Sequence, residues 1–395
     1  MNTRPENIVA ALSSVLGEGP VALHEPRFDG NEKRYLSNCV DSTFVSSVGA
    51  YVDRFETDLA RFTGAKHVVA TVNGTSALHI ALLLVGVQPG DEVLVPALSF
   101  VATANAVRYC NATPHFLDSE KSTLGIDPAA MATWLAETCT MDSGKCVNRT
   151  TGNRIAAVVP MHTFGHPCDI AGVLAVAADY GLPVVEDAAE SLGSLVGSQH
   201  TGTFGLLGIL SFNGNKIVTT GGGGAILTND SDLARRAKHL TTTAKVPHGW
   251  EYVHDEVGYN YRMPNINAAL GCAQLEELES FIASKRHLYQ KYREALSQID
   301  GIRILSEPSG TRSNYWLQTL LLDADKTDLR AEILEVLNNN GFMSRPAWNL
   351  LPSLKPFQGC PSAPLPVAKS LERRIINIPS SSGLSEFKSS DDYAQ

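Results

Sequence analysis

The sequence predicts an α/β protein built on a mainly parallel sheet with helices on both faces. Short runs rich in β-branched residues alternate with helical patterns between Lys66 and Asp230. Several of these runs are apolar on both faces, as the buried central strands of a covered sheet are. The chain of 395 residues is also too long for one small core, which favours a large domain with a smaller one attached.

Seven runs are expected to form the strands of this sheet. They are His67–Val72, Glu92–Pro96, Pro114–Leu117, Ile155–Pro160, Pro183–Asp187, Leu207–Phe212 and Gly224–Thr228. The helical segments that fall between them are Thr75–Val85, Val101–Tyr109, Pro128–Glu137 and Ile170–Tyr180. Alternation of strands and helices predicts parallel pairing, and ligands of such sheets bind at the carboxyl ends of the strands.

The rest of the chain predicts the other parts of the fold. The polar stretch from Glu137 to Arg154 is expected to be a surface excursion, and Asn265–Arg286 a long helix. We expect an N-terminal segment over residues 1–45 and a large domain over residues 46–270. The long helix and a smaller C-terminal α+β domain are expected over residues 271–395.

Charge and composition exclude some classes of function. The formal net charge of −9 disfavours general nucleic-acid binding, which needs a basic face. The N-terminus lacks the apolar run of a signal peptide, and the most apolar stretch, Ala77–Val87, is too short to span a membrane. The seven cysteines form no CxxC pair, which is typical of reduced thiols. We therefore expect a cytoplasmic protein.

The first local signal is Asn73-Gly74-Thr75-Ser76-Ala77, which follows a predicted strand and opens a helix. Glycine lets the backbone approach an anion closely. The N–H groups and hydroxyls that follow can hold a phosphate at the positive end of the helix dipole. An ordinary helix cap is the alternative interpretation, since Thr and Ser are common there.

An acidic pair, Glu186 and Asp187, ends the apolar run Pro183–Asp187. The strand end is where α/β enzymes place functional groups. Asp187 is suited to pair with a protonated pyridine nitrogen, which keeps a pyridine cofactor an electron sink. A carboxylate that caps the next helix is the alternative.

Lys216 lies in a tight turn of Asn and Gly residues just after the run Leu207–Phe212. A solvated surface charge explains this place poorly. Desolvation and nearby cations lower the pKa of a lysine, and a neutral amine can form a Schiff base with an aldehyde. Ser211 could add a hydroxyl to a phosphate site. The run Gly221–Gly224 that follows admits a close backbone approach, or is simply a flexible loop.

An acid at a strand end, then a lysine, then a glycine run is a specific order of signals. With these motifs the chain resembles the DegT/DnrJ/EryC1/StrS family of sugar aminotransferases, which use pyridoxal 5′-phosphate (PLP) and have the fold type I architecture. The similarity runs from about Phe44 to Leu275, with a looser tail to about Pro379. The matching segments are Gly74–Leu78, Gly90–Val93, Pro96–Phe100, Glu186–Ala189, Ser211–Lys216, Gly222–Gly224 and Gly258–Met263.

The resemblance implies two catalytic residues and a phosphate site. Lys216 would form the Schiff base with PLP and shuttle the proton between the substrate carbon and the cofactor. Asp187 would hold the pyridine nitrogen. Gly74, Thr75 and Ser211 would contact the cofactor phosphate.

Further cofactor contacts are implied in the same way, with residues 46–270 as the PLP-binding domain. Phe100 would stack on the pyridine ring, and Glu190 would lie near the phenolic oxygen of the cofactor. Asn260 would reach the phosphate from the partner subunit, which implies a homodimer with shared active sites. Asn213 stands where many relatives have histidine, so a role for that position is in doubt.

The implied reaction is ping-pong. Glutamate would convert PLP to pyridoxamine phosphate (PMP), and a nucleotide-linked keto sugar would then accept the amino group as Lys216 protonates the sugar carbon. The product would be an amino sugar nucleotide for surface glycan synthesis. A PLP/PMP sugar dehydratase is the nearer rival, but such relatives replace the lysine with histidine. A non-catalytic PLP- or sugar-nucleotide-binding regulator is the other rival.

Three segments resemble the branch that acts on 4-keto-6-deoxy-N-acetylhexosamine nucleotides in bacillosamine and legionaminic acid pathways. They are Phe44–Gly49, Met161–Pro167 and Gly341–Pro346. Within them His162 and Arg345 are candidates for substrate contacts, although a surface arginine is the alternative for Arg345. The segment around His162 also holds histidine and cysteine residues, but we expect no metal site there. The nucleotide base, the aminated carbon and the configuration of the amine stay open.

Overall fold

Seven strands cross the larger part of the molecule in the computed structural model, which describes residues 3–385. Their order is β1-β11-β10-β7-β6-β2-β3, where parallel bridges Val158↔Val184 and Met161↔Asp187 join the β7 side to the β6 side. Only β11 among these seven runs in the opposite direction, which confirms a mainly parallel sheet. The bounds are β1 His67–Thr71, β2 Glu92–Pro96, β3 Thr113–Leu117, β6 Arg154–Val158, β7 Val185–Asp187, β10 Leu207–Ser211 and β11 Gly224–Thr228.

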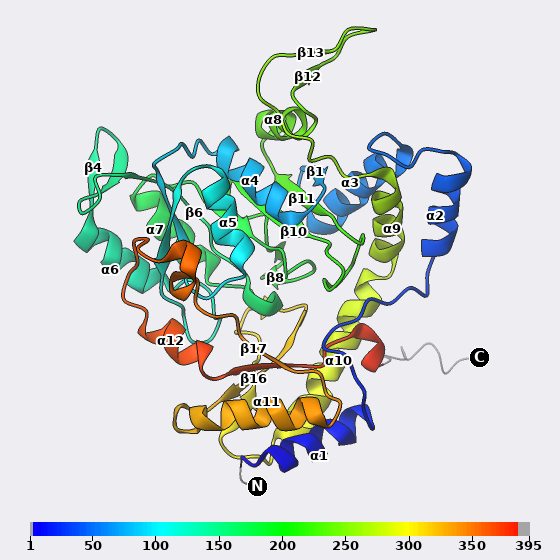
Figure 1. Cartoon of the computed structure of the whole chain (residues 1–395), viewed down its shortest axis with the longest axis vertical. Coiled ribbons are helices and arrows are strands. Elements are labelled where there is room, and N and C mark those ends of the chain that lie inside the picture. Colours follow the sequence, from blue (N-terminus) through cyan, green and yellow to red (C-terminus); the bar gives the residue numbers. More distant parts are fainter. Residues whose placement is uncertain (1–2, 386–395) are drawn as a thin grey trace.

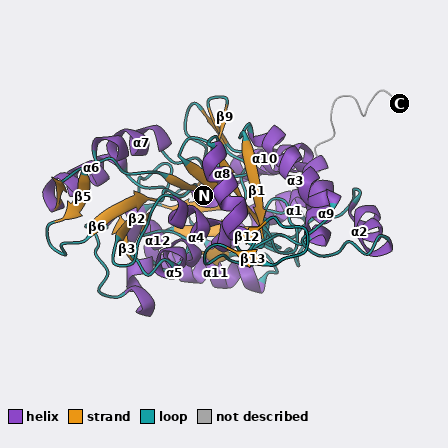
Figure 2. Ribbon diagram, turned by 90° about the horizontal axis from the view of Figure 1, so that it is seen from above, coloured by secondary structure: helices purple, strands orange, loops and turns teal. Residues whose placement is uncertain are grey.

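Helices cover both faces of this sheet, as the view in Figure 2 shows. They are α3 Ala50–Thr63, α4 Gly74–Leu84, α5 Val101–Tyr109, α6 Pro128–Thr138, α7 Ile170–Asp179, α8 Ser231–Thr241 and α9 Asn265–Glu276. The four helices predicted between strands all form, with ends within one residue of the prediction. Short polar side chains fix where several begin: Asn73, Asp127, Asp169 and Asp230 each accept a backbone N–H of the first turn.

The polar stretch over residues 137–154, expected to be a surface excursion, is mostly exposed and has regular structure. It forms a hairpin of β4, Cys139–Asp142, and β5, Lys145–Asn148, and β5 pairs antiparallel with β6. Ser143 and Gly144 at its tip both have positive φ, 49° and 78°. Two-residue hairpin turns of this hand need such angles. The sequence did not specify the hairpin, which the Ser-Gly pair could have revealed.

The long helix predicted over Asn265–Arg286 is two helices. α9 ends before Glu277, and α10 runs over Leu278–Leu296 from the edge of the large sheet down to the smaller part (Figure 1). The break does not fall at Gly271, because that glycine is a packing residue. A Cβ there would lie 2.5 Å from a ring carbon of Phe55 on α3.

The smaller part is an antiparallel sheet, in the order β14-β16-β18-β17, packed against helices. Ile8 and Leu12 of the first helix share its core with Leu288 of α10 and Ile376 of β18, so α1 packs with elements that come much later in the sequence. The predicted three-part division of the chain stays a prediction. The bounds are α1 Pro5–Leu16, α11 Arg330–Asn339, α12 Pro366–Glu372, β14 Ile302–Ile304, β16 Gln318–Leu322, β17 Arg345–Pro346 and β18 Ile375–Ile378.

Short elements complete the chain. They are α2 Glu32–Asp41, β8 Leu195–Val196, β9 Gln199–His200, β12 Lys245–Val246, β13 Val253–His254 and β15 Thr311–Arg312, with 3-10 turns Thr163–Gly165, Ala324–Leu329, Leu351–Ser353, Lys355–Phe357 and Ser382–Leu384. The β12–β13 hairpin projects from the top of the molecule in Figure 1. Within residues 3–385, no helix combines the length and apolar character needed to cross a membrane.

Candidate active site

The ends of three strands bring the predicted site residues to one edge of the sheet. β1, β7 and β10 run in the same direction, so their carboxyl ends meet there. After β1, the Asn73 side chain accepts the N–H of Ser76 at 2.7 Å and starts α4. β7 ends on Asp187. After β10, a turn closed by the N–H of Lys216 on the carbonyl of Asn213, at 3.0 Å, presents the lysine.

A cavity of about 300 Å³ lies at this edge. The predicted site residues that line it are Gly74, Thr75, Phe100, Glu190, Ser211 and Lys216. Two tryptophans from later in the sequence, Trp316 and Trp348, also line the cavity. The cavity therefore has walls from both parts of the molecule.

The amine of Lys216 faces into this cavity and away from solvent. Its side chain is 11% exposed, and Nζ lies 3.2 Å from Oε1 of Glu190. Nζ also lies 3.9 Å from the centre of the Trp316 ring, which favours a cation. The indole N–H of Trp316 donates to the carbonyl of Asn215 at 2.7 Å and fixes the ring beside the lysine turn.

Glu190 is the most perturbed carboxyl group in contact with the amine. Its side chain is 1% exposed, and burial raises its pKa to about 7, with Lys216 opposing the shift. Its second oxygen accepts the N–H of Phe164 at 2.9 Å, and Phe164 has the unusual φ of 57°. A positive φ at a non-glycine residue costs free energy and persists only where surrounding contacts stabilise it. At Phe164 this conformation directs the backbone N–H toward the carboxyl group of Glu190.

Asp187 is buried beneath the strand ends. One oxygen accepts the hydroxyl of Thr103 at 2.8 Å, and the other accepts the N–H of Ala189 at 3.2 Å. Burial raises the pKa of Asp187, while these hydrogen bonds and the charge of Lys216 oppose the shift. A cation placed beside a buried carboxyl group such as this one stabilises its ionised form.

The start of α4 packs closely against β10 and β11 because glycine stands at two positions there. A Cβ on Gly74 would lie 2.9 Å from Cβ of Ser211, and a Cβ on Gly224 would lie 2.4 Å from the carbonyl carbon of Asn73. Glycine at both positions lets β10, β11 and the first turn of α4 approach closely. The N–H groups of that turn, with the hydroxyls of Thr75 and Ser211, suit a phosphate.

Comparison with protein families adds the deciding observation. The model of the DegT/DnrJ/EryC1/StrS aminotransferase family matches residues 26–390. The chain belongs to this family. It is a PLP-dependent sugar aminotransferase of the fold type I architecture.

Individual relatives of the DegT/DnrJ/EryC1/StrS family resemble the chain over nearly its whole length. The GDP-perosamine synthase of Caulobacter vibrioides is 35% identical over 93% of this chain and 94% of its own. The UDP-N-acetyl-3-dehydro-alpha-D-glucosamine 3-aminotransferase of Acidithiobacillus ferrooxidans is 31% identical over 86% of this chain and 85% of its own. The crystal structure of the aminotransferase TlmJ from Streptoalloteichus hindustanus superposes with a TM-score of 0.83 at 27% identity, covering 95% of this chain and 96% of its own.

The cavity of this DegT/DnrJ/EryC1/StrS aminotransferase fits PLP. A buried carboxyl group that gains from a cation suits the ring nitrogen, and the glycine-lined start of α4 suits the phosphate. The amine of Lys216 lies in the same cavity, where the aldehyde would have to be. The residues that would hold the cofactor are therefore Asp187, Gly74, Thr75, Ser211 and Lys216.

Two predicted residues lie elsewhere in this chain. His162 is fully buried, with Nε2 3.0 Å from Oε2 of Glu186 and Nδ1 accepting the N–H of Cys168 at 3.1 Å. Both ring nitrogens thus serve the fold, and His162 does not line the cavity, so it is not placed to contact a substrate there. Asn260 is exposed and bridges to Thr242 through its backbone. Its contact with the phosphate of a partner subunit stays a prediction.

Arg345 lies at the start of β17, exposed, beside a second hollow that adjoins the cavity. Trp316 and Trp348 were not predicted from the sequence, because no local pattern ties them to Lys216, which lies 100 or more residues earlier. Thr103, whose hydroxyl holds Asp187, was not predicted either. A hydroxyl residue in the first turn of α5, shortly after the carboxyl end of β2, was the signal available for it.

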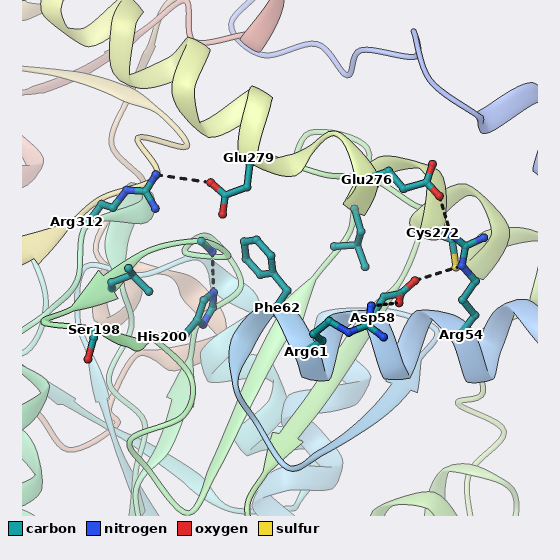
Figure 3. A pocket seen from close by; sticks show the side chains of 13 residues that line it. Arg54, Asp58, Arg61, Phe62, Ser198, His200, Cys272, Glu276, Glu279 and Arg312 are labelled. Atoms are coloured by element: carbon teal, nitrogen blue, oxygen red, sulfur yellow. Dashed lines mark hydrogen bonds and ion pairs between the residues drawn. The ribbon is translucent and has the colours of Figure 1, made fainter. Parts of the chain in front are cut away.

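A larger hollow of about 670 Å³ lies between α3, α9, α10 and the β8–β9 hairpin (Figure 3). Its charged side chains are paired with one another. The ion pairs are Arg54–Asp58 at 3.2 Å, Arg54–Glu276 at 2.6 Å, Arg61–Asp58 at 3.1 Å and Arg312–Glu279 at 3.7 Å. The predicted site residues do not line it. We call this hollow the Arg54 groove.

Proposed function

We propose that this aminotransferase moves the amino group of glutamate to a nucleotide-linked 4-keto-6-deoxy-N-acetylhexosamine. The amino sugar nucleotide formed in the cytoplasm would then serve surface glycan synthesis. The observation that carries the proposal is the amine of Lys216, enclosed in the cavity 3.2 Å from a carboxyl group with a pKa of about 7. When bound, PLP supplies an aldehyde and an electron sink.

Residues at the sheet edge bind and orient the cofactor. The first turn of α4, with Thr75 and Ser211, holds the phosphate at the positive end of the helix dipole. Asp187, fixed by Thr103, holds a proton at the ring nitrogen. Phe100 lines the cavity beside these groups and helps to exclude water.

Lys216 moves the proton of the reaction. Its amine lies on the cavity side of the turn, and as a base it takes a proton from the substrate carbon or returns one. Glu190 is within hydrogen-bonding distance of Nζ, at 3.2 Å. With a pKa of about 7 it exchanges protons readily with a neighbouring amine near neutral pH.

The acceptor is inferred from similarity. The segments Phe44–Gly49 and Gly341–Pro346 resemble the branch that acts on N-acetylated 4-keto sugars. The relative from Acidithiobacillus ferrooxidans is named for a UDP-linked N-acetyl sugar with a dehydro carbon. Both support a nucleotide-linked keto sugar with an N-acetyl group.

A screen tests this function directly. The purified enzyme with PLP is incubated with glutamate and each of a set of keto sugar nucleotides, differing in base and in keto position, and the products are weighed by mass spectrometry. We expect replacement of a keto oxygen by an amine on an N-acetylated 4-keto sugar, with 2-oxoglutarate formed in equal amount. Loss of water from the sugar instead would indicate a dehydratase, and no product from any sugar would contradict the proposal.

The predicted homodimer has its own test. Asn260→Ala should weaken retention of PLP, because Asn260 would contact the phosphate in the partner's site. Mixing the Asn260→Ala protein with the Lys216→Ala protein should then restore activity, since one hybrid site has both residues intact. Absence of rescue in mixed dimers, confirmed by two affinity tags, would contradict a shared site.

A further inference from the structure

The hollow beside Arg345 adjoins the cavity of Lys216. It measures about 490 Å³ and shares three lining residues with that cavity: Asn215, Trp316 and Trp348. Asn215 and the two indoles are therefore walls of both spaces. We call the second space the Arg345 hollow.

The Arg345 hollow has a cationic group and no acidic one. None of its lining residues is Asp or Glu. The Arg345 guanidinium donates to the carbonyl of Ser344 at 3.1 Å and to Oδ1 of Asn338 at 3.4 Å, both neutral acceptors. It forms no ion pair with any residue between 3 and 385. This differs from the Arg54 groove, where each of the three arginines faces a carboxylate.

His24 is half-buried as a residue, but its two ring nitrogens are buried and have no partner within residues 3–385. Burial, with the nearby charges of Lys285 and Lys216, holds the pKa of His24 well below its usual range. The ring is therefore neutral and carries one N–H. A buried N–H without an acceptor is unfavourable, so this position suits a ligand group that accepts a hydrogen bond.

The remaining walls suit an aliphatic chain. Phe164 and Trp348 pack with ring centres 4.8 Å apart, and Leu23 and Met343 lie on the same lining. Apolar walls with a few converging polar groups are the usual form of a small-molecule site. The lining thus offers donors for an oxyanion and apolar surface for the methylene groups that carry it.

We propose that the Arg345 hollow binds a carboxylate of the amino donor, with Arg345 at its mouth and His24 inside. The inference rests on the proposed function in one respect, that the donor is a dicarboxylic amino acid. Arg345 binds the oxyanion by charge-assisted hydrogen bonds, and His24 adds a neutral donor. His24 lies before the large domain in sequence, so the N-terminal segment helps to select the donor.

Glutarate tests this subsite without any reaction, because it has the two carboxylates of glutamate and no amino group. Its affinity for the PLP-loaded enzyme is measured by calorimetry. Arg345→Ala should weaken glutarate binding roughly tenfold to a hundredfold, and Arg345→Lys should weaken it less. Arg373→Ala is the matched control, since Arg373 is exposed on the smaller part and faces Asp328 at 3.8 Å.

His24 is tested by the same titration. His24→Leu keeps the buried volume but removes the donor, and should weaken glutarate roughly threefold to tenfold. His24→Gln keeps an N–H donor and should recover part of the affinity. Thermal unfolding of both variants establishes that the fold is retained, and equal loss in the Leu and Gln variants would contradict a hydrogen-bonding role for His24.

The two half-reactions identify which substrate uses the hollow. The rate with glutamate is followed by the absorbance of PLP, and the binding of UDP and GDP by calorimetry. Arg345→Ala should raise the KM for glutamate and leave nucleotide binding unchanged. Weaker nucleotide binding with unchanged glutarate binding would overturn the proposal, because the hollow would then serve the acceptor phosphates. Wild-type enzyme that does not bind glutarate would also overturn it.

Failure of this inference differs from failure of the proposed function. Glutarate binding that depends on Arg345, in an enzyme that never produces an amino sugar, would leave the subsite intact and remove the proposed reaction. Amino transfer to a sugar with the same KM for glutamate in the wild type and the Arg345→Ala protein would confirm the reaction and reject the subsite.

Discussion

The Arg54 groove and the cavity of Lys216 differ in size and in how their charged groups are arranged. By size alone the groove would be the better candidate for a binding site, whereas the charged groups favour the cavity. The groove is the larger, about 670 Å³ against 300 Å³. Its arginines and carboxylates are matched in ion pairs, so its electrostatic interactions are already made (Figure 3). The cavity is lined by Lys216 and Glu190, and Asp187 is buried at the end of β7. Burial raises the pKa of both carboxyl groups.

Burial of its titratable groups, and not its volume, therefore distinguishes the candidate active site from the Arg54 groove. Buried titratable groups with shifted pKa values are costly for the fold, and they persist where a ligand or a proton transfer uses them. Paired surface charges contribute little and require nothing further. The predictions below test this contrast from its largest expected effect to its smallest.

Lys216→Ala should have the largest effect. Removal of the amine should lower amino transfer by on the order of a thousandfold or more, because both the covalent attachment and the proton carrier are lost. Activity is measured by mass spectrometry of the sugar product. Borohydride reduction of the wild type with PLP, followed by peptide mapping, should label Lys216. A label on another lysine would reject the assignment, and Lys238→Ala, which removes a surface partner of Glu56, is the control.

Asp187→Asn should come next. The carboxamide has the same shape but cannot hold a proton at the ring nitrogen, so transfer should fall by roughly a hundredfold to a thousandfold. Thr103→Val removes only the hydroxyl bonded to Asp187 at 2.8 Å and should cost about tenfold. Steady-state kinetics with saturating PLP separates the two. Equal activity of Asp187→Asn and the wild type would refute its role.

Glu190→Gln should change the pH dependence of stability. The folded-state pKa of about 7 exceeds the usual 4.5, so the folded protein retains a proton that the unfolded chain has lost between these pH values. Stability should therefore fall as pH rises from 4.5 to 7, and level off above 7. The Glu190→Gln protein should not show this fall in stability, because glutamine does not titrate. Thermal unfolding of both apoproteins at a series of pH values measures it, and parallel curves would contradict the shifted pKa.

Arg54→Ala should have the smallest effect. It breaks the ion pairs to Asp58 and Glu276 and the stacking on Tyr35, whose ring centre is 4.9 Å away. Because the arginine is partly exposed, the loss in unfolding free energy should be about 1 kcal/mol. Amino transfer should stay within roughly twofold of the wild type, as expected for a surface substitution far from the site. A large loss of activity would show that the groove has a function.

The site residues that lie at the carboxyl ends of strands could be predicted from the sequence. Gly74, Glu190, Ser211 and Lys216 could be assigned to one place because parallel strands end at one edge of a sheet. Each also lies at the end of a strand or shortly after one, and the apolar runs of these strands can be recognised in the sequence. The helix bounds follow equally well from short polar caps such as Asp127 and Asp169.

The rest of the site depends on tertiary packing that no local pattern encodes. Trp316 and Trp348 reach the cavity only because the smaller part docks against the sheet edge. His162 has a sequence context that suggests a ligand contact, yet its pairing with buried Glu186 is set by strands that meet in space. The break between α9 and α10 at Glu277 could not be predicted, because neither glycine nor proline occurs there.

Because the smaller part packs against the sheet edge, two tryptophans lie where their fluorescence can report ligand binding. The chain has four tryptophans, and Trp316 and Trp348 both line the cavity and the Arg345 hollow. Trp134 is engaged elsewhere with His115, and Trp250 is 83% exposed. Occupation of either space changes the surroundings of the same two indoles. In a Trp250→Phe protein, intrinsic fluorescence should therefore register the arrival of donor or acceptor without any added dye.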